Sequence, residues 1–136
     1  MRDSSSGWDR KREGEKILIA EDEQAMRELV VEILESAGYT VIAASNGIEA
    51  VDAFNKEKNE ICLVILDRNM PEMNGDETFR ALKKIGLNVP LLISSGSIKD
   101  EGKLVGEGVT GLIGKPYSIE ELLEKVKSTL EKQKKS

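Results

Sequence analysis

Short apolar runs alternate with helical patterns five times along this chain, and this alternation narrows the accessible folds more than any other feature. The five runs are residues 17–20, 40–44, 61–66, 91–93 and 111–113. Each is followed by a segment in which apolar residues recur at helical spacing. Strands separated by helices pair in parallel, and the helices then cover both faces of the sheet. The pattern therefore predicts one doubly wound α/β domain with a five-stranded parallel sheet.

Local signals mark the expected helix ends. Asn46 with Glu49, and Ser118 with Glu121, have the spacing of a capping box, in which two side chains satisfy free N–H groups at a helix start. Gly38 follows the first helical pattern, where glycine commonly ends a helix. The expected apolar face of the last helix comprises Ile119, Leu122, Leu123, Val126 and Leu130. These signals predict helices that start and stop between the strands.

Three regions are predicted to be weak. Residues 98–107 contain Gly102 and Gly106, each of which costs a helix about 1 kcal/mol relative to alanine. Residues 1–15 are rich in serine, glycine and charge, and we expect a flexible linker or an added arm there. We expect the tail, residues 131–136, to be frayed.

The residue types that are missing exclude several chemistries. The chain has no histidine and one cysteine, so histidine-based catalysis, histidine-ligated zinc and an internal disulfide are all excluded. Its longest apolar run, Ile61 to Leu66, is far shorter than the ~20 residues that span a bilayer. The N-terminus is polar and has no signal-peptide pattern. We therefore expect no membrane insertion and a reducing, cytoplasmic location.

Acidic residues are concentrated in the middle of the chain. The net charge is −5, and residues 17–123 hold nineteen acidic against ten basic side chains. Nucleic-acid surfaces are basic, so we expect no nucleic-acid partner. The acidity is consistent with a carboxylate-rich cation site or, more simply, with a solubilising surface.

Polar side chains follow four of the expected strands. Glu21-Asp22-Glu23 follows the first, Asp67 the third, Ser94 and Ser95 the fourth, and Lys115 the fifth. In doubly wound sheets, ligands bind beyond the carboxyl ends of the strands, where the strand order reverses. Acidic groups, one or two hydroxyls and one amine are therefore expected to meet at one edge.

This set of groups suits a hard cation and phosphoryl chemistry. Mg²⁺ prefers one or two carboxylates, a carbonyl and retained waters. Asp67 follows a very apolar strand, so its charge needs a cation, either Lys115 or a metal. A carboxylate beside both cations is suited to accept a phosphoryl group, because they neutralise the charge that develops on its oxygens.

In this order and on these strand ends, the motifs resemble those of receiver domains of two-component response regulators. The matching stretches are ILIAEDE (17–23), LDRNMPEMNG (66–75), PLLISSG (90–96) and KPY (115–117). The resemblance runs from about Lys16 to Val126. It implies a flavodoxin-like (βα)5 fold with strand order 2-1-3-4-5, and a receiver domain over residues 16–130.

The resemblance also implies a metal site and an acceptor. Asp67 is the expected phosphoacceptor, and Glu21, Asp22, Asp67 and the backbone carbonyl of Asn69 are the expected Mg²⁺ ligands, with Mn²⁺ as a substitute. Glu21 stands where most receivers have aspartate. Its longer side chain leaves open whether it reaches the metal directly or through water.

The remaining implied roles concern switching. Ser95 matches the hydroxyl that hydrogen-bonds the phosphoryl group, with Ser94 as the competing choice. Lys115 contacts the phosphate, and its bond to Pro116 is expected to be cis. The implied donor is a phosphohistidine of a histidine kinase or histidine phosphotransfer domain, and the output is a downstream protein contact. A receiver of this kind is not a conventional enzyme, since it catalyses only its own phosphorylation and dephosphorylation.

Two departures from the family pattern affect the readout. Leu112 occupies the position where many receivers have a mobile aromatic residue, so an aromatic flip is excluded. Residues 94–114 contain six of the twelve glycines, and we expect this segment, around Ser95 and the fourth helix and fifth strand, to become ordered on phosphorylation.

Other functions fit the sequence less well. An aspartate-based phosphohydrolase would need a second acid at position 69, which is Asn69. A flavin or nucleotide binder would need a glycine-rich loop where residues 21–23 are acidic. A pseudo-receiver would not need the complete set of acids and lysine. A stand-alone receiver, a receiver within a hybrid sensor kinase, and a weak homodimer all remain open.

Overall fold

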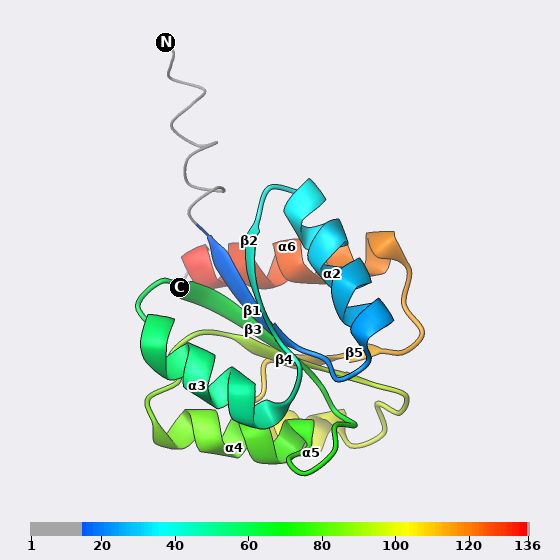
Figure 1. Ribbon diagram of the computed structural model, residues 1–136. Coiled ribbons are helices and arrows are strands. Elements are labelled where there is room, and N and C mark those ends of the chain that lie inside the picture. Colours follow the sequence, from blue (N-terminus) through cyan, green and yellow to red (C-terminus); the bar gives the residue numbers. More distant parts are fainter. Residues whose placement is uncertain (1–14, 136) are drawn as a thin grey trace.

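The computed structural model describes residues 15–135 and has one parallel sheet with helices on both faces (Figure 1). The strands are β1 Lys16–Ala20, β2 Thr40–Ala44, β3 Ile61–Asp67, β4 Leu91–Ser95 and β5 Gly111–Gly114. The helices are α2 Gln24–Ser36, α3 Gly47–Glu57, α4 Gly75–Lys84, α5 Glu101–Glu107 and α6 Ile119–Lys135. The predicted alternation of strands and helices is confirmed.

The strand order is β2-β1-β3-β4-β5, and every neighbouring pair is parallel. This confirms the predicted (βα)5 fold and its order. The chain leaves β1 toward one side to form β2 and then crosses to β3 on the other side. The reversal therefore lies beside the carboxyl ends of β1 and β3, where such sheets bind ligands.

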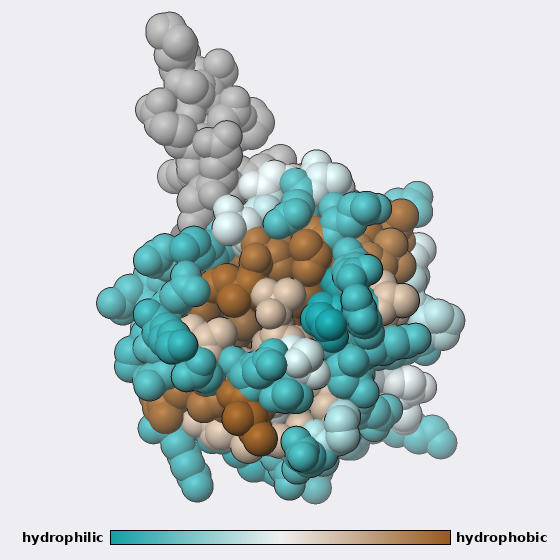
Figure 2. Space-filling model, viewed as in Figure 1, coloured by the Kyte–Doolittle hydropathy of each residue, from teal (hydrophilic) through white to brown (hydrophobic). Residues whose placement is uncertain are grey.

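The sheet separates two apolar cores, because alternate side chains of each strand point to opposite faces. α2 and α6 cover one face, and α3, α4 and α5 cover the other (Figure 1). The first core includes Ile17, Ile19, Val30, Leu34, Leu122 and Val126. The second includes Leu18, Ala20, Phe54, Phe79, Leu82 and Leu104. Figure 2 shows that hydrophilic side chains cover most of the viewed face, with apolar residues visible where edge strand β2 runs and in the region of α3 and α4.

The helix caps agree with the sequence signals, with one difference and one addition. Ser118 and Glu121 form the predicted reciprocal box. Asn46 accepts from the Glu49 N–H, but the Glu49 carboxylate accepts from the Ser45 N–H, one residue earlier than expected. A complete box that the sequence analysis missed, Asn74 with Glu77, starts α4 beside the third strand end.

The weak regions differ in part from expectation. α6 continues to Lys135 and so includes residues 131–135, while the fraying expected of this tail stays a prediction. Ile119 is 54% exposed and does not belong to the buried face of that helix. α5 starts only at Glu101. Residues 1–14 of the expected arm, and residue 136, lie outside the described residues. Within residues 15–135, no helix is both long enough and apolar enough to cross a membrane.

Candidate functional site

The ends of β1, β3 and β5 bring two acids and one lysine together. Lys115 Nζ donates to Asp67 Oδ1 at 2.9 Å and lies 3.5 Å from Glu21 Oε1. Glu21 and Asp67 are only 6% and 5% exposed. Buried carboxylates at this depth require a cationic partner, and Lys115 is that partner. The long-range meeting of these three side chains follows from the strand order.

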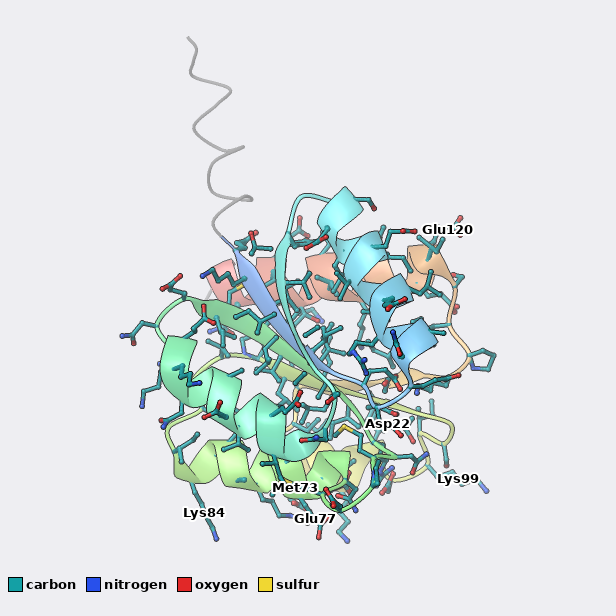
Figure 3. All side chains as sticks on the ribbon, viewed as in Figure 1. Asp22, Met73, Glu77, Lys84, Lys99 and Glu120 are labelled. Atoms are coloured by element: carbon teal, nitrogen blue, oxygen red, sulfur yellow. The ribbon has the colours of Figure 1, made fainter. Side chains whose placement is uncertain are left out.

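Asp22 completes a cluster of three carboxylates. Glu21, Asp22 and Asp67 each offer an oxygen, and these oxygens lie within 4.8 Å of one another. Asp22 is exposed and lies in the turn between β1 and α2 (Figure 3). Oxygen donors of this kind, two of them buried and one open to water, fit a hard cation that keeps part of its hydration shell. Asn69 is adjacent, since its N–H faces Asp67 Oδ1 at 3.4 Å.

The electrostatics of the site reflect its excess of negative charge. Burial raises the pKa of Glu21, an effect partly offset by the Glu23 N–H, and the charge of Asp67 raises it further. Burial alone would lower the pKa of Lys115, but its hydrogen bond and charge interaction with Asp67, together with Glu21, raise it overall. One lysine therefore serves two buried acids, and an additional cation would relieve the remaining repulsion.

The chain after β3 returns close to the end of that strand at Gly75. The Gly75 N–H donates to the Arg68 carbonyl at 2.9 Å. A Cβ at position 75 would lie 2.8 Å from both the Asp67 carbonyl oxygen and the Arg68 Cα. Glycine is therefore required by close packing and not by a left-handed turn; the left-handed residue of this loop is Glu72, with φ of 68°. The peptide bond between Lys115 and Pro116 is cis, as expected.

The two serines at the end of β4 occupy different positions. Ser94 pairs with Asp67 in the strand register. The Ser95 hydroxyl donates to the Ser97 carbonyl at 2.7 Å and accepts from the Ser97 N–H at 3.1 Å. Both of its described hydrogen bonds are thus made within its own loop. The expected contact of Ser95 with a phosphoryl group remains a prediction.

Leu112 is 5% exposed and packs in the core beneath α4 and α5. It occupies the position at which many receivers have an aromatic residue. Its backbone N–H donates to Glu101 Oε2 at 3.0 Å, which ties β5 to the start of α5.

Two arginines near the site were missed by the sequence analysis. Arg27 on α2 donates to the Glu21 carbonyl at 2.9 Å and so braces the loop after β1. Arg68, directly after Asp67, pairs with Asp76 and Asp100. An arginine following a buried strand-end acid is itself a signal of a local ion pair. Its partners, eight and 32 residues away, give no signal in the sequence.

Curated relatives share this region of the chain. Sensor kinase CckA of Brucella abortus is 36% identical over 119 residues, a match that covers 86% of this chain and 13% of that protein. Sporulation initiation phosphotransferase F of Bacillus subtilis is 33% identical over 121 residues, which cover 85% of this chain and 94% of that protein. Two transcriptional regulators in the comparison match over only 50% of their own length. This chain therefore corresponds to whole small proteins and to parts of larger ones.

Solved structures agree. Chemotaxis protein CheY4 of Vibrio cholerae superposes with a TM-score of 0.77 at 31% identity, covering 84% of this chain and 97% of that one. The receiver domain of hybrid histidine kinase CckA gives 0.72 at 31% identity, covering 85% and 98%. The family model of the response regulator receiver domain matches residues 17–127. The fold, the motifs and these matches agree, and the chain belongs to the receiver domain family of two-component signalling.

Proposed function

We propose that Asp67 is the phosphoacceptor of this receiver and that Lys115, Glu21 and Asp22 form the machinery around it. The observation that carries the proposal is the buried Asp67 carboxylate, held at 2.9 Å by Lys115 beside two further acids at the reversal point of the sheet. The other buried acid of residues 15–135, Glu21, belongs to the same cluster but lies 3.5 Å from Lys115 Nζ, whereas Asp67 accepts from it at 2.9 Å.

The step is a phosphoryl transfer between side chains. Lys115 and the Asn69 N–H both face Asp67 Oδ1, which leaves Oδ2 as the oxygen we assign to the attack. Oδ2 forms a bond to the phosphorus of a phosphohistidine while the N–P bond breaks. The electron pair of that bond remains on the imidazole nitrogen, and the product is an aspartyl phosphate. The histidine must come from another protein or domain, because this chain has none.

A bound Mg²⁺, or Mn²⁺ in its place, would neutralise the charge on the phosphoryl oxygens. Glu21, Asp22 and Asp67 are the side chains that would hold it, together with the Asn69 carbonyl. Lys115 supplies the second positive charge and holds the acceptor carboxylate in place. We therefore expect removal of Lys115 to impair signalling by the phosphorylated domain more than it impairs Mg²⁺ binding.

Signalling then depends on a change around Ser95, α5 and β5. The Ser95 hydroxyl would leave Ser97 to hydrogen-bond the phosphoryl group, and the surface of α5 and β5 would present this change to a downstream protein. We expect a histidine kinase or phosphotransfer domain as donor, a cytoplasmic location, and no activity beyond the receiver's own phosphorylation and dephosphorylation. Relatives of both kinds leave a stand-alone receiver and a domain of a hybrid kinase as alternatives.

The test uses a small phosphodonor such as acetyl phosphate, with and without Mg²⁺. Intact-mass measurement should show a gain of one phosphoryl group that requires Mg²⁺ and disappears in Asp67→Asn. Asp52→Asn is the matched control, because Asp52 is an exposed acid on α3 that pairs with Lys56. Isothermal titration should show that Asp22→Asn weakens Mg²⁺ binding while Asp52→Asn does not. Phosphorylation that persists in Asp67→Asn would refute the assignment.

A further inference from the structure

Arg68 joins the loop after β3 to the segment between β4 and α5. Its Nε and Nη2 donate to the two oxygens of Asp76 at 3.1 and 3.0 Å. Its Nη1 donates to Asp100 Oδ1 at 2.9 Å, and Nη2 also donates to Asp100 Oδ2. Two edges of the guanidinium group, Nε with Nη2 and Nη1 with Nη2, are therefore each paired with a carboxylate. Such two-point pairs fix geometry as well as charge.

The two pairs differ in what they connect. Asp76 lies in the first turn of α4, only eight residues beyond Arg68, so that pair stays within one loop. Asp100 immediately precedes α5, and its pair with Arg68 crosses to the segment that follows Ser95. Of the two pairs, only the pair with Asp100 connects the loop after β3 to residues 96–100, the segment that follows Ser95. The side chain of Arg68 is 20% exposed and that of Asp100 40%, so water screens the pair in part.

The side chain of Asp100 pairs with Arg68 and does not cap α5. It occupies the N-cap position of α5, where an aspartate side chain usually accepts from the backbone of the first turn, but it makes no such bond. α5 has seven residues, two of them glycine, and Leu104 is its one buried side chain. A helix this short has little stability of its own. Its position therefore depends on tethers such as Arg68–Asp100 and Glu101 to the Leu112 N–H.

The segment that Asp100 anchors contains the contact that occupies the Ser95 hydroxyl. Ser95 bonds Ser97 in both directions, and residues 96–99 are exposed. Figure 3 shows the Lys99 side chain projecting from the domain at the same end of the sheet as Asp22. Asp100 directly follows this exposed segment, so its pair with Arg68 anchors one end of the segment in which Ser95 bonds Ser97.

We propose that Arg68 is a positioning residue whose pair with Asp100 holds the β4–α5 segment in the conformation that withholds the Ser95 hydroxyl from Asp67. This inference rests on the proposed role of Asp67 as acceptor. Formation of the aspartyl phosphate then has to compete with the pair, so the pair sets how readily the domain switches. Arg68 acts on the site through Asp100 and Ser95 and does not act on phosphorus.

The test compares Asp100→Asn with the matched control Asp76→Asn, which removes a carboxylate from the same guanidinium but leaves the cross-loop pair. Beryllium trifluoride with Mg²⁺ serves as a stand-in for the phosphoryl group. We expect Asp100→Asn to bind it about fivefold more tightly, the scale of a modest coupling carried by a partly exposed pair, and Asp76→Asn to change binding less than twofold. In Arg68→Gln, the added Asp100→Asn change should have no further effect, because the pair is already lost.

Hydrogen exchange without metal or beryllium trifluoride supplies the second readout. Peptides covering residues 96–104 should exchange about fivefold faster in Asp100→Asn than in the wild type, and peptides of β1 and α2 should not change. Wild-type protein that fails to bind beryllium trifluoride would refute the proposed function itself. Wild-type binding with equal or weaker binding by Asp100→Asn would overturn the inference alone, as would equal exchange in residues 96–104.

Discussion

Gly75 packs so closely under the acceptor strand that a single methyl group should disturb the site. The Cβ of Gly75→Ala would lie 2.8 Å from the Asp67 carbonyl oxygen and from the Arg68 Cα, whereas ordinary contacts begin at 3.4 Å. About 0.6 Å of separation must be gained, and every atom involved is backbone. Overpacking against atoms that cannot rotate away costs about 1–3 kcal/mol. We expect a loss near 2 kcal/mol in the free energy of unfolding, or about 8 °C in Tm for a domain of this size.

The same shift should slow phosphorylation, because the displaced peptide carries Asp67. A displacement of about half an ångström should reduce the rate with acetyl phosphate about tenfold, since misplacement by 1 Å costs up to about a hundredfold. Denaturant unfolding followed by circular dichroism measures the stability, and intact-mass kinetics measure the rate. Both should be recorded on the same preparation, so that folded protein is known to be the species assayed.

Gly106→Ala is the matched control for the methyl group. Gly106 lies in α5, and a Cβ there has nothing within 4 Å. Alanine in place of this helical glycine should stabilise the domain by about 0.5–1 kcal/mol. If Gly75→Ala were as stable and as fast as the wild type, the close approach of α4 to the acceptor strand would not exist as described.

Three further predictions follow from individual contacts. Lys115→Met leaves Asp67 buried without its partner at 2.9 Å and should lower stability by about 2 kcal/mol in denaturant unfolding at pH 7; an unchanged midpoint would contradict the pairing. Because the folded-state pKa of Glu21 is raised, its contribution to stability is present below the unfolded pKa of 4.5 and is lost as pH rises through the folded value. Metal-free wild type should thus lose stability relative to Glu21→Gln over that interval, and parallel pH profiles would argue against it. Asn74→Ala removes the cap of α4 and should cost about 1 kcal/mol, measured by thermal unfolding, with exposed Asn88→Ala as a neutral control.

The meeting of Asp67 and Lys115 was predictable because topology alone places them together. Five parallel strands in order 2-1-3-4-5 bring the ends of β1, β3 and β5 to one edge, whatever the rotamers. The apolar strands and the position of each acid relative to its strand end are visible in the sequence. The acid cluster could therefore be predicted by residue before any coordinates.

Contacts that depend on loop conformation were not predictable. The partner of the Ser95 hydroxyl is set by the backbone of residues 96–100, which no periodic pattern determines. The pair of Arg68 with Asp100 joins residues 32 positions apart. At Gly75 the constraint is the neighbouring strand and not a positive φ, and the sequence alone does not distinguish these two reasons for a glycine. Ile119 fits the helical period, but it is the first residue of α6 and remains 54% exposed.

Direct localisation of the phosphoryl group tests the central claim. Borohydride reduces an acyl phosphate to an alcohol, so an aspartyl phosphate at position 67 becomes homoserine in the peptide that contains it. Protein treated with acetyl phosphate and Mg²⁺, then reduced and digested, should show homoserine at position 67 by tandem mass spectrometry, and none when Mg²⁺ is withheld. Homoserine at Asp22 or at any other aspartate, with position 67 unmodified, would contradict the assignment of Asp67 as the acceptor.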